Sequence, residues 1–389
     1  MNAVRADIAI VGGALVGAAL ARALEGTRVA LVAQERRNPT APAAAFDSRI
    51  YAISPANAAF LATLGAWRRI PAERLTAVHA MRVFGDDGRS RLDFDAYRAG
   101  ASELAWIVED TLLQDALWAS LEGQAQLELL APGLCEKLTL GATGAWIALA
   151  DGRQLDSRLV VGADGARSFV RQQAGIDAIE RRYGQTAVVA NFACERPHRN
   201  VAFQWFQSGP VLALLPLPGN HVSMVWSTSD AHAEQITALE PAELAAEVGA
   251  ASRHELGELS LAGAVRGFPL RRLQASHSVA ARVALVGDAA HVVHPLAGQG
   301  ANLGFQDARV LAEILRAREP FRDPGDPRLL RRYERARAED ILAMRATVHG
   351  LFTLFDADRE VLRFARNAGL NLVDRIPVLK NVLIRKAMS

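Results

Sequence analysis

The stretch that decides the fold runs Leu285-Val286-Gly287-Asp288-Ala289-Ala290-His291 and continues through Pro295 to Gly298-Gln299-Gly300-Ala301-Asn302. The apolar residues before Gly287 predict a buried strand that ends in one carboxylate, followed by a Gly/Pro-rich loop and a helix over 302–316. An Asp at a strand end can accept hydrogen bonds from polyol hydroxyls, and free backbone N–H groups at a helix start can face an electron-rich ring edge. Both features suit a flavin.

The composition is that of an ordinary folded protein of 389 residues, half of them hydrophobic and 22% charged. The length suggests two intimately joined domains. A net charge of +2 gives no support for a nucleic-acid partner. Cys135 and Cys194 lie far apart, so a disulfide framework is not expected and a reducing cytosol fits. Without a long apolar run or a signal-peptide pattern, we expect a cytoplasmic protein.

A second nucleotide-binding pattern lies near the N-terminus. A short apolar strand over 8–11 leads into Gly12-Gly13-Ala14-Leu15-Val16-Gly17, a helix over 18–24 and a second strand over 28–32. This is a βαβ unit of the length that binds a dinucleotide. On this segment alone, a Gly-rich turn of some other α/β protein explains the pattern equally well.

Two positions depart from the dinucleotide fingerprint. Ala14 replaces its second glycine, and Ala33 stands where the second strand should end in an acid. We expect Gln34, or Glu35 if the strand end shifts, to bond a ribose hydroxyl. Adenosine binding is therefore expected to be weaker or differently arranged.

A third segment, Leu159-Val160-Val161-Gly162-Ala163-Asp164-Gly165-Ala166-Arg167-Ser168, is another apolar strand that ends in Asp-Gly, with a helix predicted over 169–174. Taken alone it indicates only a tight turn. The pair His291-x-x-His294 invites a metal hypothesis, which we discount because no Cys lies nearby and Pro295 interrupts any helix that could align the imidazoles. We expect His291 to pack against polar backbone.

In this order, the three segments resemble the flavoprotein aromatic hydroxylases, the group A flavin monooxygenases, and within them the ubiquinone-biosynthesis hydroxylase family. The resemblance covers nearly the whole chain and is most specific from Gly287 to Gly304. Supporting matches are Phe46-Asp47-Ser48-Arg49-Ile50-Tyr51-Ala52-Ile53, Trp106-Ile107-Val108-Glu109, Phe268-Pro269-Leu270 and Tyr333-Glu334-x-x-Arg337.

The resemblance implies an α/β fold in which a Rossmann-like FAD-binding domain is interleaved with a mixed β-sheet substrate domain, followed by C-terminal helices. We expect strands over 186–194, 201–205, 211–217 and 221–226 to form a floor over the flavin. Candidate pocket walls are Phe206, Leu214, Val225 and Phe268, although core packing is the better explanation for any one of them. The expected parts are 1–70, 106–182 and 276–340 for the FAD-binding domain, 71–105 and 183–275 for the substrate domain, and 341–389 for the helical segment.

The resemblance also assigns roles to single residues. It implies that Asp288 holds the ribityl chain, that Arg49 contacts flavin and pyrophosphate, and that Asp164 and Arg167 serve flavin and nicotinamide cofactor. The loop from Pro295 to Asn302 would lie along the isoalloxazine, where a helix N-terminus stabilises negative charge. The implied catalytic residues are Pro295, Gly300 and Ala301, and the implied cofactor-binding set is Gly12, Gly13, Ala14, Gly17, Gln34, Glu35, Arg49, Asp164, Arg167, Gly287, Asp288, Gly298, Gln299, Gly300, Ala301 and Asn302.

The implied reaction is hydroxylation of the aromatic ring of a polyprenylated phenol in ubiquinone biosynthesis. NAD(P)H would bind transiently and reduce FAD, and dioxygen would react through a C4a-hydroperoxyflavin in a pocket that excludes water. We find no nucleophile–base pair, which fits chemistry driven by a cofactor. One alternative is a flavin hydroxylase of a soluble aromatic acid, which needs an arginine in the pocket. Another, motivated by Ala14 and Ala33, is a non-catalytic flavoprotein-like subunit of a biosynthetic complex.

The C-terminal stretch 359–389 is basic, with seven Lys/Arg residues and two acids, and its apolar residues follow helical spacing. We favour a helix packed on the FAD-binding domain with a solvated charged face. The alternative is docking on an anionic membrane or a partner, which a polyprenyl substrate favours. The expected location is cytoplasmic, with peripheral contact at the inner membrane face or a ubiquinone-biosynthesis complex as that alternative.

Overall fold

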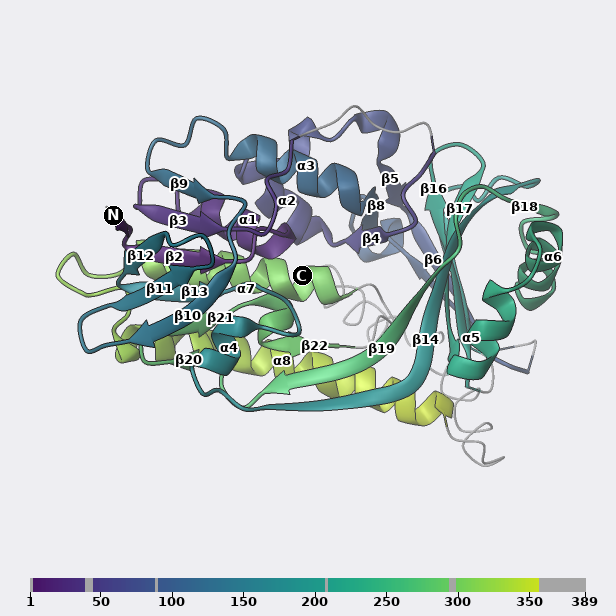
Figure 1. The fold of residues 1–389 in the computed structure, drawn as a ribbon. Coiled ribbons are helices and arrows are strands. Elements are labelled where there is room, and N and C mark those ends of the chain that lie inside the picture. Colours follow the sequence, from purple (N-terminus) through teal and green to yellow (C-terminus); the bar gives the residue numbers. More distant parts are fainter. Residues whose placement is uncertain (1–2, 39–44, 88–89, 207–208, 294–298, 357–389) are drawn as a thin grey trace.

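The computed structural model describes residues 3–38, 45–87, 90–206, 209–293 and 299–356. Its first layer is a six-stranded sheet that is parallel except at one edge (Figure 1). The three apolar runs that precede the nucleotide-binding segments lie side by side at its centre. In order across the sheet, the strands are β20 (Val279–Ala280), β21 (Val283–Leu285), β13 (Leu159–Gly162), β2 (Ile8–Val11), β3 (Val29–Val32) and β9 (Leu127–Leu130).

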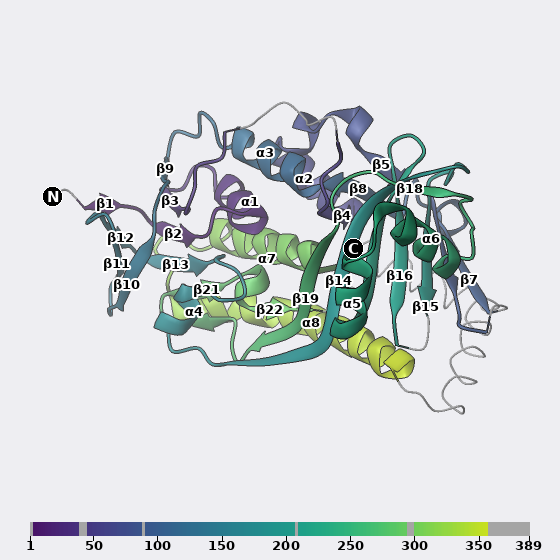
Figure 2. The same cartoon turned by 45° about the vertical axis from the view of Figure 1, so that its right-hand side comes forward.

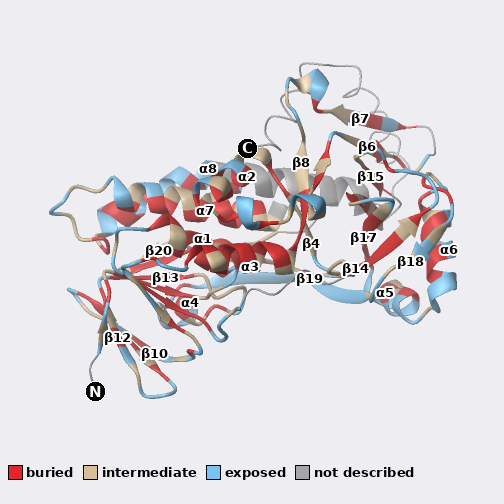
Figure 3. Cartoon of the chain, turned by 90° about the horizontal axis from the view of Figure 1, so that it is seen from above, coloured by how far each residue is buried: buried red, intermediate tan, exposed pale blue. Residues whose placement is uncertain are grey.

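Both faces of this sheet are covered, which explains why its strands are continuously apolar rather than alternating. Ile8 and Ile10 pack into a core shared with five helices, while Ala9 and Val11 pack into a second core on the other face (Figure 3). The helices are α1 (Leu15–Ala23), α2 (Pro55–Thr63), α3 (Asp110–Ser120), α7 (Gln299–Arg316) and α8 (Pro327–Asp356). The opposite face carries α4 (Phe169–Gln173) and the small sheet β1 (Val4–Arg5), β12 (Gln154–Ser157), β11 (Ala145–Leu149) and β10 (Cys135–Leu140).

The second layer is a nine-stranded mixed sheet whose outer face packs on two helices, α5 (Asp230–Thr237) and α6 (Pro241–Ala251). Its strand β17 alternates strictly, with Val222 and Met224 in the core under the helices and Ser223 and Val225 on the other face. In order, the strands are β22 (His291–Val292), β19 (Arg266–Ala275), β14 (Ala178–Cys194), β17 (His221–Ser229), β16 (Val211–Leu217), β15 (Val201–Phe206), β6 (Ala80–Phe84) and β7 (Arg91–Asp95), with β18 (Leu259–Leu261) paired to β14.

The long antiparallel pair β14 and β19 joins the two layers (Figures 1 and 2). At one end these strands belong to the second sheet, and at the other end β19 pairs with β22, directly after the Gly287 turn. A small sheet made of β4 (Ile50–Ile53), β8 (Ala105–Glu109) and β5 (Thr76–Val78) lies between the layers. The loops at the carboxyl ends of the parallel strands therefore face the inner side of the second sheet.

The expected α/β fold, with a Rossmann-like layer interleaved with a mixed β-sheet layer, is confirmed. The domain boundaries remain a prediction. Helix α7 begins at Gln299 rather than 302, and β14 begins at Ala178 rather than 186, because its exposed first half is polar and pairs only with β19. Of the predicted C-terminal helices, α8 reaches Asp356, and residues 357–389, with their basic stretch, lie outside the described residues. No helix in the described part of the chain is long and apolar enough to cross a membrane.

Gly17 tests how tightly α1 docks on the sheet. A Cβ at Gly17 would stand 1.8 Å from the carbonyl oxygen of Gly12 and 3.2 Å from Cβ of Ala163. We expect Gly17→Ala to lower the free energy of unfolding by about 1–3 kcal/mol, the usual cost of overpacking, as measured by urea denaturation. Gly249→Ala in α6 is the matched control, because its new Cβ meets only the movable ring of His254 at 3.3 Å. Equal stability of the two variants would contradict this packing.

Candidate active site

One cavity of about 1350 Å³ opens between the two layers. Single small-molecule pockets span roughly 300–1,000 Å³, so this space can hold more than one ligand. The three predicted nucleotide-binding segments border one side of it, and the inner face of the second sheet borders the other. Predicted site residues that line the cavity are Gly12, Gly13, Ala14, Gln34, Glu35, Arg49, Asp164, Arg167, Asp288, Gly300, Ala301 and Asn302.

The first glycine turn brings the start of α1 close to the neighbouring segment. Gly12 has φ +111°, donates its N–H to the carbonyl oxygen of Val32 at 2.8 Å, and leaves no room for a Cβ, which would stand 2.2 Å from the carbonyl oxygen of Ala163. Ala14 is the N-cap of α1, and no side chain in the described ranges caps it. The N–H groups at the start of α1 are therefore available to an anion such as a pyrophosphate.

Gly13 explains why the second strand does not end in an acid. Ala33 is buried directly under Gly13, where a Cβ at position 13 would stand 2.6 Å from that of Ala33. The next two residues, Gln34 and Glu35, are exposed and line the cavity, as the ribose-binding prediction requires. The carbonyl oxygen of Gly13 accepts a hydrogen bond from Nε1 of Trp118 at 2.8 Å, a contact that the sequence did not reveal.

The Asp164 carboxylate serves the local structure first. It accepts hydrogen bonds from the hydroxyl of Ser168 and, at 3.0 Å, from the N–H of Val170 at the start of α4. Burial raises the pKa of Asp164, and these hydrogen bonds oppose the rise. Nearby, Arg171 is buried and donates to the carbonyl oxygens of Ala166 and Ala289, each at 2.8 Å. This arginine, unremarked in the sequence, ties the Asp-Gly segment to the Gly287 turn.

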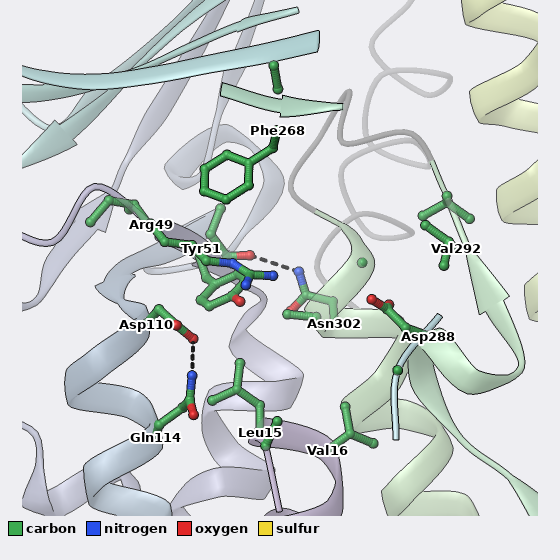
Figure 4. Close-up of a pocket in the computed structure, with 18 of the residues that line it drawn as sticks. Leu15, Val16, Arg49, Tyr51, Asp110, Gln114, Phe268, Asp288, Val292 and Asn302 are labelled. Atoms are coloured by element: carbon green, nitrogen blue, oxygen red, sulfur yellow. Dashed lines mark hydrogen bonds between the residues drawn. The ribbon is translucent and has the colours of Figure 1, made fainter. Parts of the chain in front are cut away.

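Asp288 projects into the cavity from the 3₁₀ turn η4 (Gly287–Ala289) (Figure 4). The residue is exposed to the cavity, but desolvation by the protein around it raises the pKa of its carboxylate, while His291, Arg49 and Arg271 act to lower that pKa. Asp288 thus offers an accessible hydrogen-bond acceptor at the edge of the cavity. It can meet the hydroxyls of a polyol chain there.

The turn that carries Asp288 is fixed by a buried carboxylate behind it. Asp307 of α7 is 0% exposed and accepts hydrogen bonds from the N–H of Gly287 at 2.9 Å, Nε2 of His291 at 2.7 Å and Nε of Arg337 at 2.7 Å. Burial alone would raise the pKa of Asp307, but His291 and Arg337 outweigh it and lower the pKa. Our expectation that His291 packs against polar backbone is wrong, because its imidazole is paired with this carboxylate.

The Tyr333-Glu334-x-x-Arg337 motif lies in α8, and its tyrosine and arginine both make buried hydrogen bonds. Both side chains are 1% exposed, and the hydroxyl of Tyr333 donates to the carbonyl oxygen of Leu285 at 2.9 Å. Burial raises the pKa of Tyr333 well above its usual value. The spacing i, i+4 places the two residues on one helical face. That spacing was the signal that the two side chains share one side of the helix, where Tyr333 bonds Leu285 and Arg337 bonds Asp307 of α7.

Asn302 holds the start of α7 in place with its side chain. Its Nδ2 donates to the carbonyl oxygen of Ala52 at 2.8 Å (Figure 4). Its Oδ1 accepts from the N–H of Ser54 at 2.9 Å. The adjacent Gly300 and Ala301 line the cavity, as the ring-edge prediction requires. Pro295 and Gly298 lie outside the described residues, and Gln299 is the first residue of α7.

Arg49 borders the same space as Asp288 and Asn302 (Figure 4). Its guanidinium lies 5.5 Å from the centre of the Tyr51 ring, which is close enough for a cation–π contact. Cavity-lining residues that the sequence did not single out include Arg37, Asp110, Gln114, Trp118 and Cys135. Burial raises the pKa of the Cys135 thiol to about 12, so it is not a nucleophile at neutral pH.

The predicted pocket walls divide into two groups. Val225 and Phe268 line the cavity. Leu214 is 0% exposed in the core under α5 and α6, and Phe206 packs in a small core with Val83 and Leu92, so neither is a wall. Alternation along each strand decides which residues face inward, and the sequence alone did not give its phase.

Among the described residues, no group of three or more His, Cys, Asp and Glu side chains could hold a metal ion. The imidazole of His291 is engaged with Asp307, and His294 lies outside the described ranges.

A sequence profile of the FAD binding domain family matches residues 5–346. The chain belongs to this FAD-binding family. The ubiquinone hydroxylase UbiL of Rhodospirillum rubrum is 38% identical, over 99% of this chain and 90% of its own length. The 3-demethoxyubiquinol 3-hydroxylase of Escherichia coli is 35% identical, over 98% of both chains.

Among solved structures, PqsL of Pseudomonas aeruginosa, described as a probable FAD-dependent monooxygenase, superposes with a TM-score of 0.78 at 26% identity, over 94% of this chain and 100% of its own. The family match and the relatives together make this chain an FAD-dependent monooxygenase, a member of the group A flavin enzymes.

The residues of the cavity fit FAD. The Gly12 turn approaches Ala163 so closely that only a glycine can stand there, and the N–H groups at the start of α1 suit the pyrophosphate. Asp288 supplies an acceptor for the ribityl hydroxyls, and Gly300 and Ala301 bring the start of α7 to the same cavity. The roles of the single residues remain predictions.

Asp288 is the residue whose replacement tests the flavin site. Loss of a charged acceptor is worth about 1.5–3 kcal/mol, so we expect Asp288→Ala to weaken FAD binding by about tenfold to a hundredfold. The measurement is the dissociation constant of FAD from the apoprotein, followed by flavin fluorescence. Asp151→Ala removes a carboxylate from an exposed turn and is the control. Wild-type affinity in Asp288→Ala would show that the carboxylate does not hold the cofactor.

Proposed function

We propose that this monooxygenase hydroxylates the aromatic ring of a polyprenylated phenol in ubiquinone biosynthesis, with NAD(P)H as reductant and dioxygen as oxygen donor. The observation that carries the proposal is the cavity, which joins a flavin-binding edge to an apolar chamber. The two relatives are named as hydroxylases of ubiquinone or a ubiquinol precursor, which supports this substrate class.

The apolar chamber suits a hydrophobic substrate and keeps water away from the reacting atoms. The side of the cavity near β6, β7 and β8 is lined by Val78, Met81, Phe94, Leu104 and Ile107. Apolar walls of this kind favour an isoprenoid chain at roughly 25 cal/mol for each Å² buried. They also limit access of water, which would otherwise divert the oxidising equivalents to hydrogen peroxide.

Protein groups at the flavin edge supply position and electrostatics. FAD, when bound, supplies the electron transfer and the activation of oxygen. The start of α7 at Gly300 and Ala301 places N–H groups where negative charge must be stabilised, and Asn302 holds that helix end through Ala52 and Ser54. Pro295, which the resemblance implies beside the ring, completes the proposed catalytic set.

We infer that NAD(P)H binds only transiently. The described residues contain one βαβ unit of the dinucleotide-binding kind, at β2, α1 and β3, and the FAD occupies it in this proposal. Asp164 and Arg167 line the cavity, which supports their proposed part in both flavin and nicotinamide binding.

A soluble aromatic acid is the second candidate substrate, and one observation favours it. Arg271 lines the cavity and could pair with a carboxylate, although it already lies 3.3 Å from Glu180. The non-catalytic alternative loses half of its basis, since Ala33 is explained by its packing under Gly13. Contact with a membrane or a ubiquinone-biosynthesis complex remains a proposal that rests on the substrate class.

Product analysis tests the proposed reaction. The purified holoprotein is mixed with NADH or NADPH, dioxygen and either a prenylated phenol or a small carboxylated phenol. We expect the prenylated phenol to gain one oxygen atom by mass spectrometry and to raise the rate of NAD(P)H oxidation at least tenfold. Arg271→Gln should leave this reaction within about twofold. Stimulation by the carboxylated phenol alone, lost in Arg271→Gln, would overturn the proposal in favour of a soluble acid.

A further inference from the structure

We propose that Ser223 is a substrate-specificity residue whose hydroxyl bonds a second oxygen substituent of the phenol ring, a methoxyl or a further hydroxyl. The inference rests on the proposed function and adds to it a point of attachment for the ring.

Ser223 belongs to the cavity side of β17. Its neighbours Val222 and Met224 are buried in the core under α5 and α6, so alternation along the strand turns the Ser223 side chain to the opposite face. Ser223 lines the cavity together with Val225 and Ser227, which share that face.

The Ser223 hydroxyl is buried without a partner. The residue is 1% exposed, and its Oγ makes no hydrogen bond to any described part of the chain. Directly opposite it across the β14–β17 pair stands Asn191, which is 2% exposed and whose Oδ1 also lacks a partner. Its Nδ2 is used, since it donates to the carbonyl oxygen of Asp47 at 2.9 Å. Of these two residues, Ser223 lines the cavity, and its unpaired hydroxyl is costly there unless a ligand pairs with it.

The cavity wall around Ser223 has one part suited to the aromatic ring of the proposed substrate and another suited to its isoprenoid tail. Between Ser223 and the far strands, the same row across the sheet runs through Leu215, Ala202 and Met81, all apolar. Neighbouring strands are about 4.8 Å apart, so the row extends roughly 14 Å from β17 to β6. Beside Ser223, the next row holds the smaller Ala213 and Val225. In this proposal the aromatic ring lies over Ser223, Ala213 and Val225, and its isoprenoid chain is directed along the apolar row toward Met81.

The pairing chemistry selects the substituent. A serine hydroxyl can donate and accept. A second ring hydroxyl can therefore pair with Ser223 in either direction, and a methoxyl oxygen can accept from it. A ring position that bears hydrogen instead leaves the Ser223 hydroxyl unpaired, so the site discriminates against it.

The test compares two prenylated phenols that differ by one ring methoxyl, bound to the holoprotein and turned over by it. In Ser223→Ala, we expect binding of the methoxylated phenol, followed by the change in flavin absorbance, to weaken about tenfold, and kcat/KM to fall by a similar factor. For the phenol without the methoxyl, affinity and kcat/KM should change less than twofold. Ser223→Thr keeps the hydroxyl and should restore most of the discrimination.

Ser157→Ala is the matched control, because Ser157 is 2% exposed with an unpaired Oγ and lies in β12, away from the cavity. It should bind both phenols as wild type does. If Ser223→Ala lost affinity and kcat/KM equally for both phenols, or lost neither, the inference would be overturned. The proposed function would still stand as long as the wild-type protein hydroxylates the phenols. Wild-type protein that binds neither phenol would overturn both.

Discussion

The carboxylate of Asp307 is the constraint on which the active site depends. It is fully buried in α7, and a buried charge is stable only when its partners are well placed. Three donors from two segments meet it: the N–H of Gly287 and the imidazole of His291 from the 287–291 segment, and the guanidinium of Arg337 from α8. Replacing Asp307 would remove the acceptor that all three donors share. Asp307 and its three donors, which we call the Asp307 hub, therefore fix how the 287–291 segment, α7 and α8 pack together.

This arrangement connects the buried charge to the flavin site. Gly287 is held at φ +59°, a conformation that favours glycine, and the next residue, Asp288, is directed into the cavity. On the other side, Val16 of α1 packs against both Gly287 and Gly304, where added Cβ atoms would approach its Cγ2 to 3.2 and 2.6 Å. The first glycine turn and the Gly287 turn are thus locked into one surface. In the proposed assignment, FAD contacts both turns.

The chain order of apolar strands and Gly/Asp turns was enough to predict the α/β class and the segments that border the cavity. Packing details were not predictable, because they depend on residues far apart in sequence. Ala33 looked like a missing acid and is in fact the residue that fits under Gly13. The sequence around His291 did not indicate a pairing with Asp307, which lies sixteen positions later, although Nε2 of His291 is 2.7 Å from Oδ2 of Asp307. Which residues of a strand face the cavity also depends on how the second sheet packs. That packing places Leu214 and Phe206 in cores rather than in the cavity wall.

The most direct test of the hub is hydrogen–deuterium exchange at the amide of Gly287 in the apoprotein, compared between wild type and Asp307→Asn. Asparagine keeps the shape but removes the charge that holds three donors. The account predicts slow exchange at Gly287 in wild type and exchange at least tenfold faster in the variant, with the amides of β2 and β3 unchanged. Equal protection of Gly287 in both proteins would contradict the claim that Asp307 fixes the turn.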